Sequence, residues 1–213
     1  MNAVAILLAA GSSERMGRTK ALLLWRGQPL LSHQLQQIQK SRVAECVVVL
    51  GHEAESLEPL VRPPMRPGWK ARAVRNPHYR EGKCSSILAG LRSLPSRPDG
   101  LVIASVDQPL DHRLLNLLCR LAEEDWGRSE SASRRTILVP TFRGRRGHPP
   151  LFCGSLMGEL MGISEESEGL KAVMRRNPER VREVPWADEG ILLDLNAPHD
   201  LLPPDLRQRQ TPT

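Results

Sequence analysis

The sequence predicts one α/β domain in which helices cover both faces of a mostly parallel β-sheet. Short aliphatic runs alternate with segments of helical periodicity along the 213 residues, as is typical of such sheets. The first run, residues 4–10, leads directly into a loop of glycine, serine and basic residues. No shift in composition marks a second domain. We therefore expect a single domain over residues 1–202 and a frayed polar tail over residues 203–213.

Each expected element follows from a local pattern. Residues 4–10 are too few to span a membrane and show no helical stripe, so they predict a buried parallel strand. Leucine and isoleucine recur at helical spacing over residues 30–38, with Gln and Lys on the other face. By the same criteria, further strands are expected at 45–50, 71–75, 100–106, 136–140, 181–184 and 191–195. Helices are expected at 54–60, 83–94, 111–124, 153–161 and 169–175, of which the first and the last two are short. A proline-rich loop is expected at 62–68, and a solvated acidic turn at 164–168.

The composition is that of an ordinary folded protein with an excess of positive charge. Hydrophobic residues make up 40% of the chain and charged residues 25%, the formal net charge is +6, and aromatic residues are only 3%. Because Lys and Arg are dispersed and few rings are available for base stacking, we expect no nucleic-acid partner. An anionic small-molecule substrate accounts for the charge equally well.

The cysteines and the N-terminal run indicate the compartment. Cys46, Cys84, Cys119 and Cys153 are widely separated and form no Cys-x-x-Cys pair, which favours reduced thiols over a zinc site or disulfides. The first aliphatic run lacks the basic region and cleavage site of a signal peptide, and no other stretch is long enough to cross a bilayer. We therefore expect a cytoplasmic protein without a membrane partner.

The loop after the first strand carries the strongest functional signal. Its candidate ligand-binding residues are Gly11, Ser12, Ser13, Arg15, Gly17 and Lys20. Glycines let a ligand approach the backbone closely, and hydroxyls, free backbone N–H groups and two cations together form a cradle for a polyphosphate. A tight turn with incidental basic residues is the alternative.

Two more polar features follow expected strands. Asp107 follows the run 100–106, and ligands collect at the carboxyl ends of strands in open α/β sheets. Its carboxylate suits Mg²⁺, although it could instead cap the next helix. Ser85 and Ser86, close to Gly82, begin another helix and offer hydroxyl and N–H groups to an anion, with a simple N-cap as the alternative.

The loop also resembles a known family. The segments Leu8-Ala9-Ala10-Gly11, Arg15-Met16-Gly17 and Lys20 match the pattern L-A-A-G-x-S-x-R-M-G-x-x-K. This pattern is a signature of the molybdenum cofactor nucleotidyltransferase family, most closely of its cytidylyltransferase branch. Further motifs of the family follow in the expected order as far as Asp200. The resemblance implies a three-layer Rossmann-like nucleotidyltransferase fold.

The resemblance assigns the nucleotide site and the metal site. It implies catalytic roles for Arg15, Lys20 and Asp107, the two cations acting on the triphosphate. The nucleotide contacts that it implies are Leu8, Ala9, Ala10, Gly11, Ser12, Ser13, Arg15, Lys20, Asn76, Gly82, Ser85 and Ser86. Mg²⁺ would be held by Asp107 and by the second acidic position of the closing D-x-D-T-P-x-D motif. That position is Asn196 here, an uncharged ligand.

The resemblance also assigns an acceptor side. A G-x-x-G-H-P element of the family matches Gly147, His148 and Pro149, and Arg145 and Arg146 add charge that could meet an acceptor phosphate. By composition alone, this basic loop could be a solvated turn. His148 could also be a structural histidine that bonds a neighbouring carbonyl, so no acid–base role is assigned to it.

The implied activity is transfer of CMP from CTP to molybdopterin, with release of pyrophosphate. The implied partners are a nucleoside triphosphate, a molybdopterin-type acceptor, and a molybdoenzyme or its chaperone. Ala10 stands where the guanylyl branch usually carries glycine, which narrows the space beside the base and suits a pyrimidine. Two alternatives remain. One is a cytidylyl- or uridylyltransferase acting on a sugar phosphate or an isoprenoid precursor, and the other is a non-catalytic nucleotide- or cofactor-binding protein.

Overall fold

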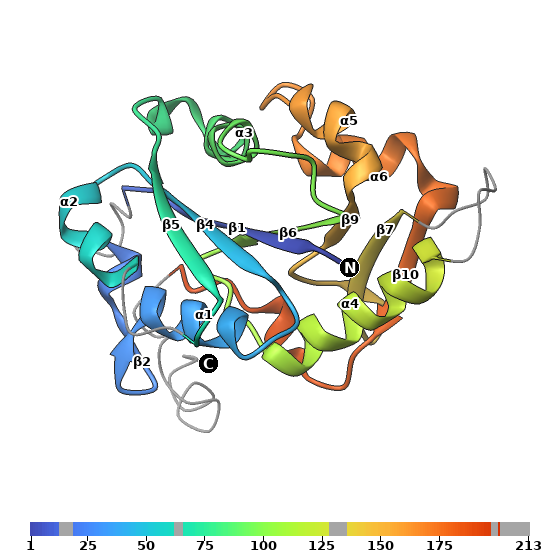
Figure 1. The fold of residues 1–213 in the computed structure, drawn as a ribbon, viewed down its shortest axis with the longest axis horizontal. Helices are drawn as coiled ribbons and strands as arrows, with labels where there is room; N and C mark the ends of the chain where they lie inside the picture. The colour runs from blue at the N-terminus through green and yellow to red at the C-terminus, as the bar shows by residue number, and fades with distance from the viewer. Residues whose placement is uncertain (13–18, 62–65, 128–135, 197–199, 201–213) are drawn as a thin grey trace, which may run out of the picture.

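A mixed β-sheet runs through the middle of the molecule, with helices on both of its faces (Figure 1). The computed structural model describes residues 1–12, 19–61, 66–127, 136–196 and 200. Within these residues the sheet has eight strands in the order β10-β7-β9-β6-β1-β4-β5, with β8 paired to β7. The strands are β1 (Ala3–Ala9), β4 (Glu45–Leu50), β5 (Lys70–Arg75), β6 (Gly100–Ser105), β7 (Ile137–Phe142), β8 (Arg145–Arg146), β9 (Leu151–Cys153) and β10 (Val181–Pro185).

Most strand pairs are parallel, which confirms the predicted fold class. β1 lies between β4 and β6 and is parallel to both, and β10 is parallel to β7. β9 pairs antiparallel with β6 and β7 and joins the two parallel groups, and the short strand β8 is also antiparallel to β7. The carboxyl ends of β1, β4 and β6 therefore meet at one edge of the sheet.

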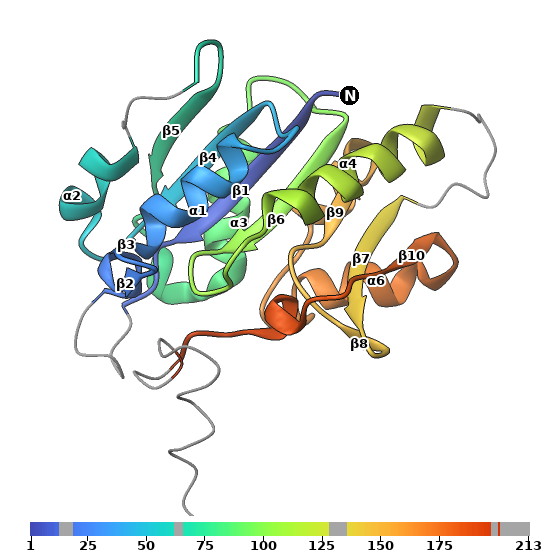
Figure 2. The ribbon, with the colours of Figure 1, turned by 90° about the horizontal axis from the view of Figure 1, so that it is seen from below.

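The helices form two layers. They are α1 (Leu30–Gln39), α2 (Ala54–Leu57), α3 (Lys83–Arg92), α4 (His112–Gly127), α5 (Met157–Met161) and α6 (Leu170–Arg176). α3, α5 and α6 lie on one face of the sheet, and α1 and α4 lie on the other, where Figure 2 shows them in front of the strands. A small hairpin, β2 (Leu24–Trp25) and β3 (Gln28–Pro29), precedes α1.

The strand β1 is buried on both faces, which explains its unbroken aliphatic sequence. Ala3, Ala5 and Leu7 pack toward α1 and α4, while the alternate residues Val4 and Ile6 pack toward α3. On α3, a Cβ at Gly90 would lie 2.6 Å from the Ile6 side chain. This glycine therefore permits the close contact between helix and sheet.

One predicted element is wrong, and the predicted pattern lacks the strand β9. The expected strand at 191–195 is a short 3₁₀ turn, Glu189–Leu192, followed by chain that pairs with no described strand. Its polar backbone bonds to loops instead, because Ile191 O accepts from His148 N and Leu195 N donates to Asp107 O. The missing strand β9 ends at Cys153 and is too short to show a two-residue period. The helix expected over 153–161 is present as a 3₁₀ turn, Gly154–Leu156, followed by α5.

The helix α1 departs from the expected division into an apolar face and a polar face. Gln34 is fully buried, among the apolar residues Leu30, Leu31, Leu35 and Ile38 of the same helix. It lies three residues after Leu31 and four before Ile38, and therefore within the stripe that faces the sheet. A buried glutamine requires buried partners.

Other predictions concern segments outside the described residues, the cysteines and membrane-spanning helices. Residues 62–65 of the proline-rich loop and the tail 203–213 lie outside the described residues. Cys46, Cys84, Cys119 and Cys153 are all buried and free. Among the described helices, none has the length and apolarity needed to span a membrane.

Candidate active site

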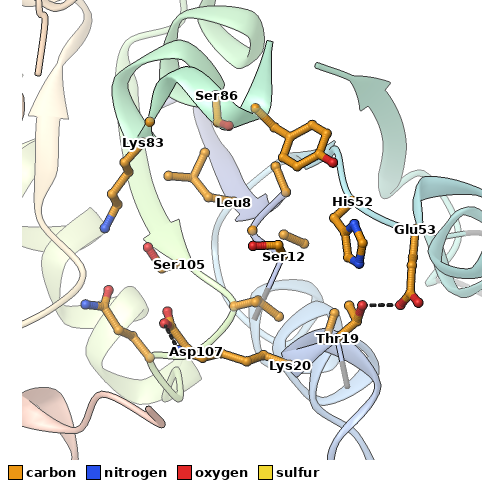
Figure 3. Close-up of a pocket in the computed structure, with 18 of the residues that line it drawn as sticks. Leu8, Ser12, Thr19, Lys20, His52, Glu53, Lys83, Ser86, Ser105 and Asp107 are labelled. Atoms are coloured by element: carbon orange, nitrogen blue, oxygen red, sulfur yellow. Dashed lines mark hydrogen bonds and ion pairs between the residues drawn. The ribbon is translucent and has the colours of Figure 1, made fainter. Parts of the chain in front are cut away.

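A cleft of about 980 Å³ opens where β1, β4 and β6 end (Figure 3). Its walls come from the loop after β1, the loop after β4, the start of α3 and the turn after β6. The lining residues are Leu8, Ala9, Ala10, Gly11, Ser12, Thr19, Lys20, Ala21, His52, Glu53, Tyr79, Arg80, Gly82, Lys83, Ser86, Ser105, Val106, Asp107, Gln108 and Asp194. The cleft thus gathers side chains from distant parts of the sequence at one edge of the sheet.

Lys20 connects two oxygen ligands at this edge. Its Nζ donates to Asp107 Oδ2 at 2.9 Å and to Asn196 Oδ1 at 2.7 Å. The Lys20 and Asp107 side chains are only 16% and 25% exposed. One ammonium group is therefore held by a carboxylate and an amide oxygen from two distant segments of the chain.

Backbone and side-chain bonds hold these ligands in place. Leu195 N donates to Asp107 O at 2.9 Å, and Gln108 Nε2 donates to Asp194 Oδ1 at 2.7 Å. The segment 194–196 is thereby tied to the turn that carries Asp107. These bonds bring residues 194–196 of the predicted closing motif next to the end of β6, although these three residues form no strand.

The two oxygens fit a divalent cation. Because the Lys20 ammonium is bonded to both Asp107 Oδ2 and Asn196 Oδ1, these atoms converge on a single positive charge. Carboxylate and amide oxygens are ligands that suit Mg²⁺. The described residues contain no cluster of three or more His, Cys, Asp or Glu side chains arranged for a metal. Such a cation would therefore complete its coordination with phosphate and water oxygens.

The opposite wall joins the ends of β1 and β4. His52 N donates to Ala10 O at 3.0 Å, and the Thr19 hydroxyl donates to the Glu53 carboxylate. A Cβ at Gly51 would lie 2.6 Å from the Tyr79 side chain and 2.7 Å from Ala10 O. Only glycine allows this close approach beside the cleft.

Asn76 fixes the loop before α3 and does not line the cleft. Asn76 is 4% exposed, and its Nδ2 donates to the hydroxyls of Ser85 and Ser86 at 3.0 and 3.1 Å. Of the predicted nucleotide contacts in this loop, Gly82 and Ser86 line the cleft, whereas Asn76 and Ser85 do not. The latter two shape the loop.

The acidic turn at 164–168 was predicted only to meet solvent, and Glu165 corrects this. Its side chain is exposed, but its Oε1 accepts a 2.6 Å bond from the backbone N–H of Cys84 in the first turn of α3. A Cβ at Gly82 would overlap the same carboxylate. Burial, reinforced by the Glu165 charge, raises the pKa of the Cys84 thiol to about 11. One N–H group expected to meet an anionic ligand is therefore already bonded.

The predicted acceptor residues lie outside the lining of the cleft. Arg145 and Arg146 form the exposed strand β8, and Arg146 Nε donates to Glu183 Oε1 at 2.9 Å. Gly147 packs against Ile191, and the peptide bond between His148 and Pro149 is cis. None of the five predicted acceptor residues, 145–149, is among the lining residues.

Charged residues of the cleft nevertheless affect the pKa of His148. Burial lowers the pKa of His148, and the Lys83 charge lowers it further, whereas the charges of Asp194 and Asp107 oppose this effect. The imidazole therefore lies within range of the charges of Lys83, Asp107 and Asp194, and it is neutral near pH 7.

Several lining residues were not predicted from the sequence, and three predicted ones cannot be placed. Ser13, Arg15 and Gly17 lie outside the described residues. The lining residues that the sequence analysis did not assign to a site are Thr19, Ala21, His52, Glu53, Tyr79, Arg80, Lys83, Ser105, Val106, Gln108 and Asp194. A glycine directly after the aliphatic run 45–50 was the available signal for His52 and Glu53.

Comparison with known proteins identifies relatives along most of the chain. Residues 5–181 match the family model described as the MobA-like NTP transferase domain. The purine catabolism protein PucB of Bacillus subtilis (strain 168) is 29% identical, covering 92% of this chain and 93% of that protein. The nicotine blue oxidoreductase of Paenarthrobacter nicotinovorans is 31% identical, covering 90% of each. A probable molybdenum cofactor guanylyltransferase of Bacillus cereus (strain AH187) is 28% identical, covering 66% of this chain and 62% of that protein.

Solved structures share the fold. A nucleotidyl transferase from Methanothermobacter thermautotroptrophicus superposes with a TM-score of 0.74 at 23% identity, over 98% of this chain and 97% of that one. Rv0371C of Mycobacterium tuberculosis H37Rv, in complex with manganese, gives a TM-score of 0.66 at 20% identity, with the same coverage. The predicted Rossmann-like nucleotidyltransferase fold and the predicted family are confirmed. The three curated relatives named above are not described as cytidylyltransferases.

Proposed function

The chain belongs to the MobA-like NTP transferase domain family, and we propose that it transfers CMP from CTP to the phosphate of molybdopterin. The reaction class, nucleotidyl transfer, follows from the family. The cytosine base, the molybdopterin acceptor and Mg²⁺ are the proposed specifics. The product would then pass to a molybdoenzyme or its chaperone.

One observation carries the proposal: the Lys20 ammonium lies between Asp107 and Asn196 in the wall of the cleft. In nucleotidyl transfer, the protein mainly positions the substrates and neutralises the charge that develops on the leaving pyrophosphate. Lys20 supplies a cation on a flexible stem that can turn to a phosphate oxygen. Asp107 and Asn196 would then hold Mg²⁺. When bound, this ion withdraws charge from the phosphate oxygens and orients them.

The bond changes need no protein base. An oxygen of the acceptor phosphate forms a bond to the α-phosphorus of CTP, and the bond from that phosphorus to pyrophosphate breaks. The nucleophile is already ionised at neutral pH, so no proton has to be removed. His148, whose pKa is lowered by burial, is accordingly a neutral polar group near the acceptor side.

The choice of base is supported by Ala10. This residue is 5% exposed and lines the cleft, and its methyl group takes up space that a glycine would leave to a purine. The relative from Bacillus cereus is named as a probable guanylyltransferase, so GTP is the second candidate. The space beside residue 10 is the structural feature that favours the smaller cytosine base of CTP over the guanine base of GTP.

A triphosphate panel tests the proposal. The purified protein is incubated with Mg²⁺, with each of CTP, GTP, ATP and UTP, and with molybdopterin, a sugar phosphate or an isoprenoid phosphate as the acceptor. Pyrophosphate release and the mass of the product are followed. We expect the cytosine dinucleotide, and no product from the Asp107→Ala variant. A Lys40→Ala variant, which removes an exposed lysine at the end of α1, serves as the matched control.

The outcomes separate the alternatives. If product formed only with GTP, the nucleotide substrate would be GTP and not CTP. If pyrophosphate were released only with a sugar phosphate or an isoprenoid phosphate, that compound and not molybdopterin would be the acceptor. Nucleotide binding without turnover for every pair would indicate a non-catalytic binding protein, and Asn196→Asp should then create activity.

A further inference from the structure

A buried amide on α1 holds the turn that carries Asp107. Gln34 is 0% exposed, and its Nε2 donates to Val106 O and to Gln108 O, both at 2.8 Å. Its Oε1 accepts from Leu110 N at 2.9 Å. All three bonds are buried and join residues more than seventy positions apart in the chain, with separations of 72, 74 and 76.

The two carbonyl groups belong to the residues on either side of Asp107. The backbone is therefore fixed both before and after the carboxylate, by a single side chain on a neighbouring helix. That helix is itself anchored, because Leu30, Leu31 and Leu35 of α1 are buried against the sheet. The amide thus transfers the rigidity of α1 to the turn after β6.

The precision of this turn matters for both oxygen ligands. Asp107 Oδ2 and Asn196 Oδ1 must reach the same cation, and Asp107 O in turn accepts from Leu195 N, next to Asn196. A displacement of the turn would move both ligands. Sites of this kind lose function when their ligands are about 1 Å out of place.

We propose that Gln34 is the positioning residue that sets the geometry of the Asp107 cation site. It touches neither substrate nor metal and acts through the backbone of residues 106–110. This inference rests on the proposed function, in which Asp107 and Asn196 hold the divalent cation. A purely structural glutamine would affect stability, whereas a positioning glutamine also changes metal affinity in the folded protein.

The same helix offers a matched control. Gln37 Oε1 accepts from His112 N at 3.2 Å and lies 3.0 Å from His112 Nδ1. It therefore also links α1 to a distant segment, the start of α4, but it makes no bond to residues 106–110. Gln37→Met removes a comparable connection without affecting the turn of Asp107.

The test measures Mn²⁺ binding by electron paramagnetic resonance with CTP present, for the natural chain and for Gln34→Met, Gln37→Met and Asp107→Ala. Thermal unfolding and CTP binding without metal are measured on the same samples. We expect Gln34→Met to weaken Mn²⁺ binding about tenfold and to leave metal-free CTP binding within about twofold. The Gln37→Met variant should bind Mn²⁺ with the affinity of the natural chain, and the Asp107→Ala variant should lose most of its Mn²⁺ binding.

The failures are distinguishable. If Asp107→Ala loses Mn²⁺ binding but folded Gln34→Met keeps it, the positioning role is overturned and the proposed metal site stands. If Asp107→Ala binds Mn²⁺ normally, the proposed metal site fails, and the inference with it. Should Gln34→Met not fold, Gln34→Asn replaces it. This variant keeps a neutral amide but is one methylene shorter, so it cannot reach both carbonyl oxygens as Gln34 does, and Mn²⁺ binding should weaken in the same direction.

Discussion

The Lys20 Nζ and the Asp107 Oδ2 lie 2.9 Å apart although 87 positions separate the two residues in the chain. The pair forms because β1 and β6 are adjacent and parallel, so that the loops after them meet. It places a cation and an anion side by side in the wall of the cleft. Triphosphate and divalent metal need these two charges together.

Replacing Lys20 tests whether its charge serves chemistry or stability. Lys20→Ala should lower kcat/KM for pyrophosphate release on the order of a hundredfold, because a preorganised cation is removed from the developing charge. The free energy of unfolding should change by no more than about 1 kcal/mol, as for a partly exposed ion pair. Urea unfolding and steady-state rates measured together check this, with Lys40→Ala as the control. Parallel losses of rate and stability would assign the residue to the fold.

Restoring a carboxylate at position 196 tests the second metal ligand. Asn196→Asp adds a charge to an oxygen that already shares a cation with Asp107, so the Mg²⁺ concentration for half-maximal rate should fall roughly tenfold. A rate titration with Mg²⁺, supported by Mn²⁺ binding, measures the change. An unaltered Mg²⁺ requirement would show that residue 196 does not ligate the metal.

The exposed arginines of β8 should act on the acceptor alone. Removing both Arg145 and Arg146 should raise the KM for the acceptor about fivefold and leave the KM for the triphosphate unchanged. Arg145→Ala should have the larger single effect, because Arg146 is already paired with Glu183. Arg42→Ala, a salt-bridged arginine just before β4, is the control. If both KM values rose together, the two arginines would not form a separate acceptor site.

The Glu165 carboxylate at the start of α3 should weaken binding of anions. Glu165→Gln keeps an oxygen for Cys84 N but removes a negative charge beside the cleft residues Gly82 and Lys83. CTP affinity measured by calorimetry should rise about threefold at low salt, and the gain should fade at high salt. Glu166→Gln removes the same charge one position later in the turn. An equal gain there would show a general charge effect rather than a local one.

The buried His33 should make stability fall in acid. Burial lowers the pKa of His33, the charges of Arg26 and Lys40 lower it further, and its Nδ1 has no hydrogen-bond partner in the described part of the chain. Below about pH 6.5 the unfolded chain binds the proton first, so the free energy of unfolding decreases as the pH falls toward the lowered value.

His33→Leu removes this linkage. The decrease in unfolding free energy between about pH 7.5 and about pH 5 should therefore be smaller in the variant than in the natural chain. Urea unfolding at both pH values measures it. His148 contributes in the same direction in both proteins, since burial also lowers its pKa. Equal decreases in the two proteins would exclude His33 as a source.

The parts of the fold that were predictable are those in which a side-chain pattern directly reports the environment. β1 could be predicted because a strand buried on both faces must be aliphatic throughout. Asp107 could be predicted because it follows the aliphatic strand β6 closely, and Lys20 because it belongs to the glycine-bearing basic loop after β1. Predicting that these two residues lie close together also requires the rule that the carboxyl ends of parallel strands meet at one edge of the sheet.

The rest depends on contacts that no local pattern encodes. β9 has three residues, and the segment after Ile191 is aliphatic because it is buried, not because it pairs. Gln34 has the residue type of a solvated helix face, and only the carbonyls of the turn after β6 explain its burial. Glu165 likewise meets α3 through a fold-level contact between segments 81 positions apart.

The central claim is that a triphosphate and its metal bind between Lys20 and Asp107. A crystal structure with a non-hydrolysable CTP analogue and Mg²⁺ tests it most directly. We predict phosphates lodged between these two residues, with the Lys20 ammonium moved from Asp107 onto a phosphate oxygen. Phosphates bound elsewhere, with the ion pair between Lys20 and Asp107 intact, would contradict it.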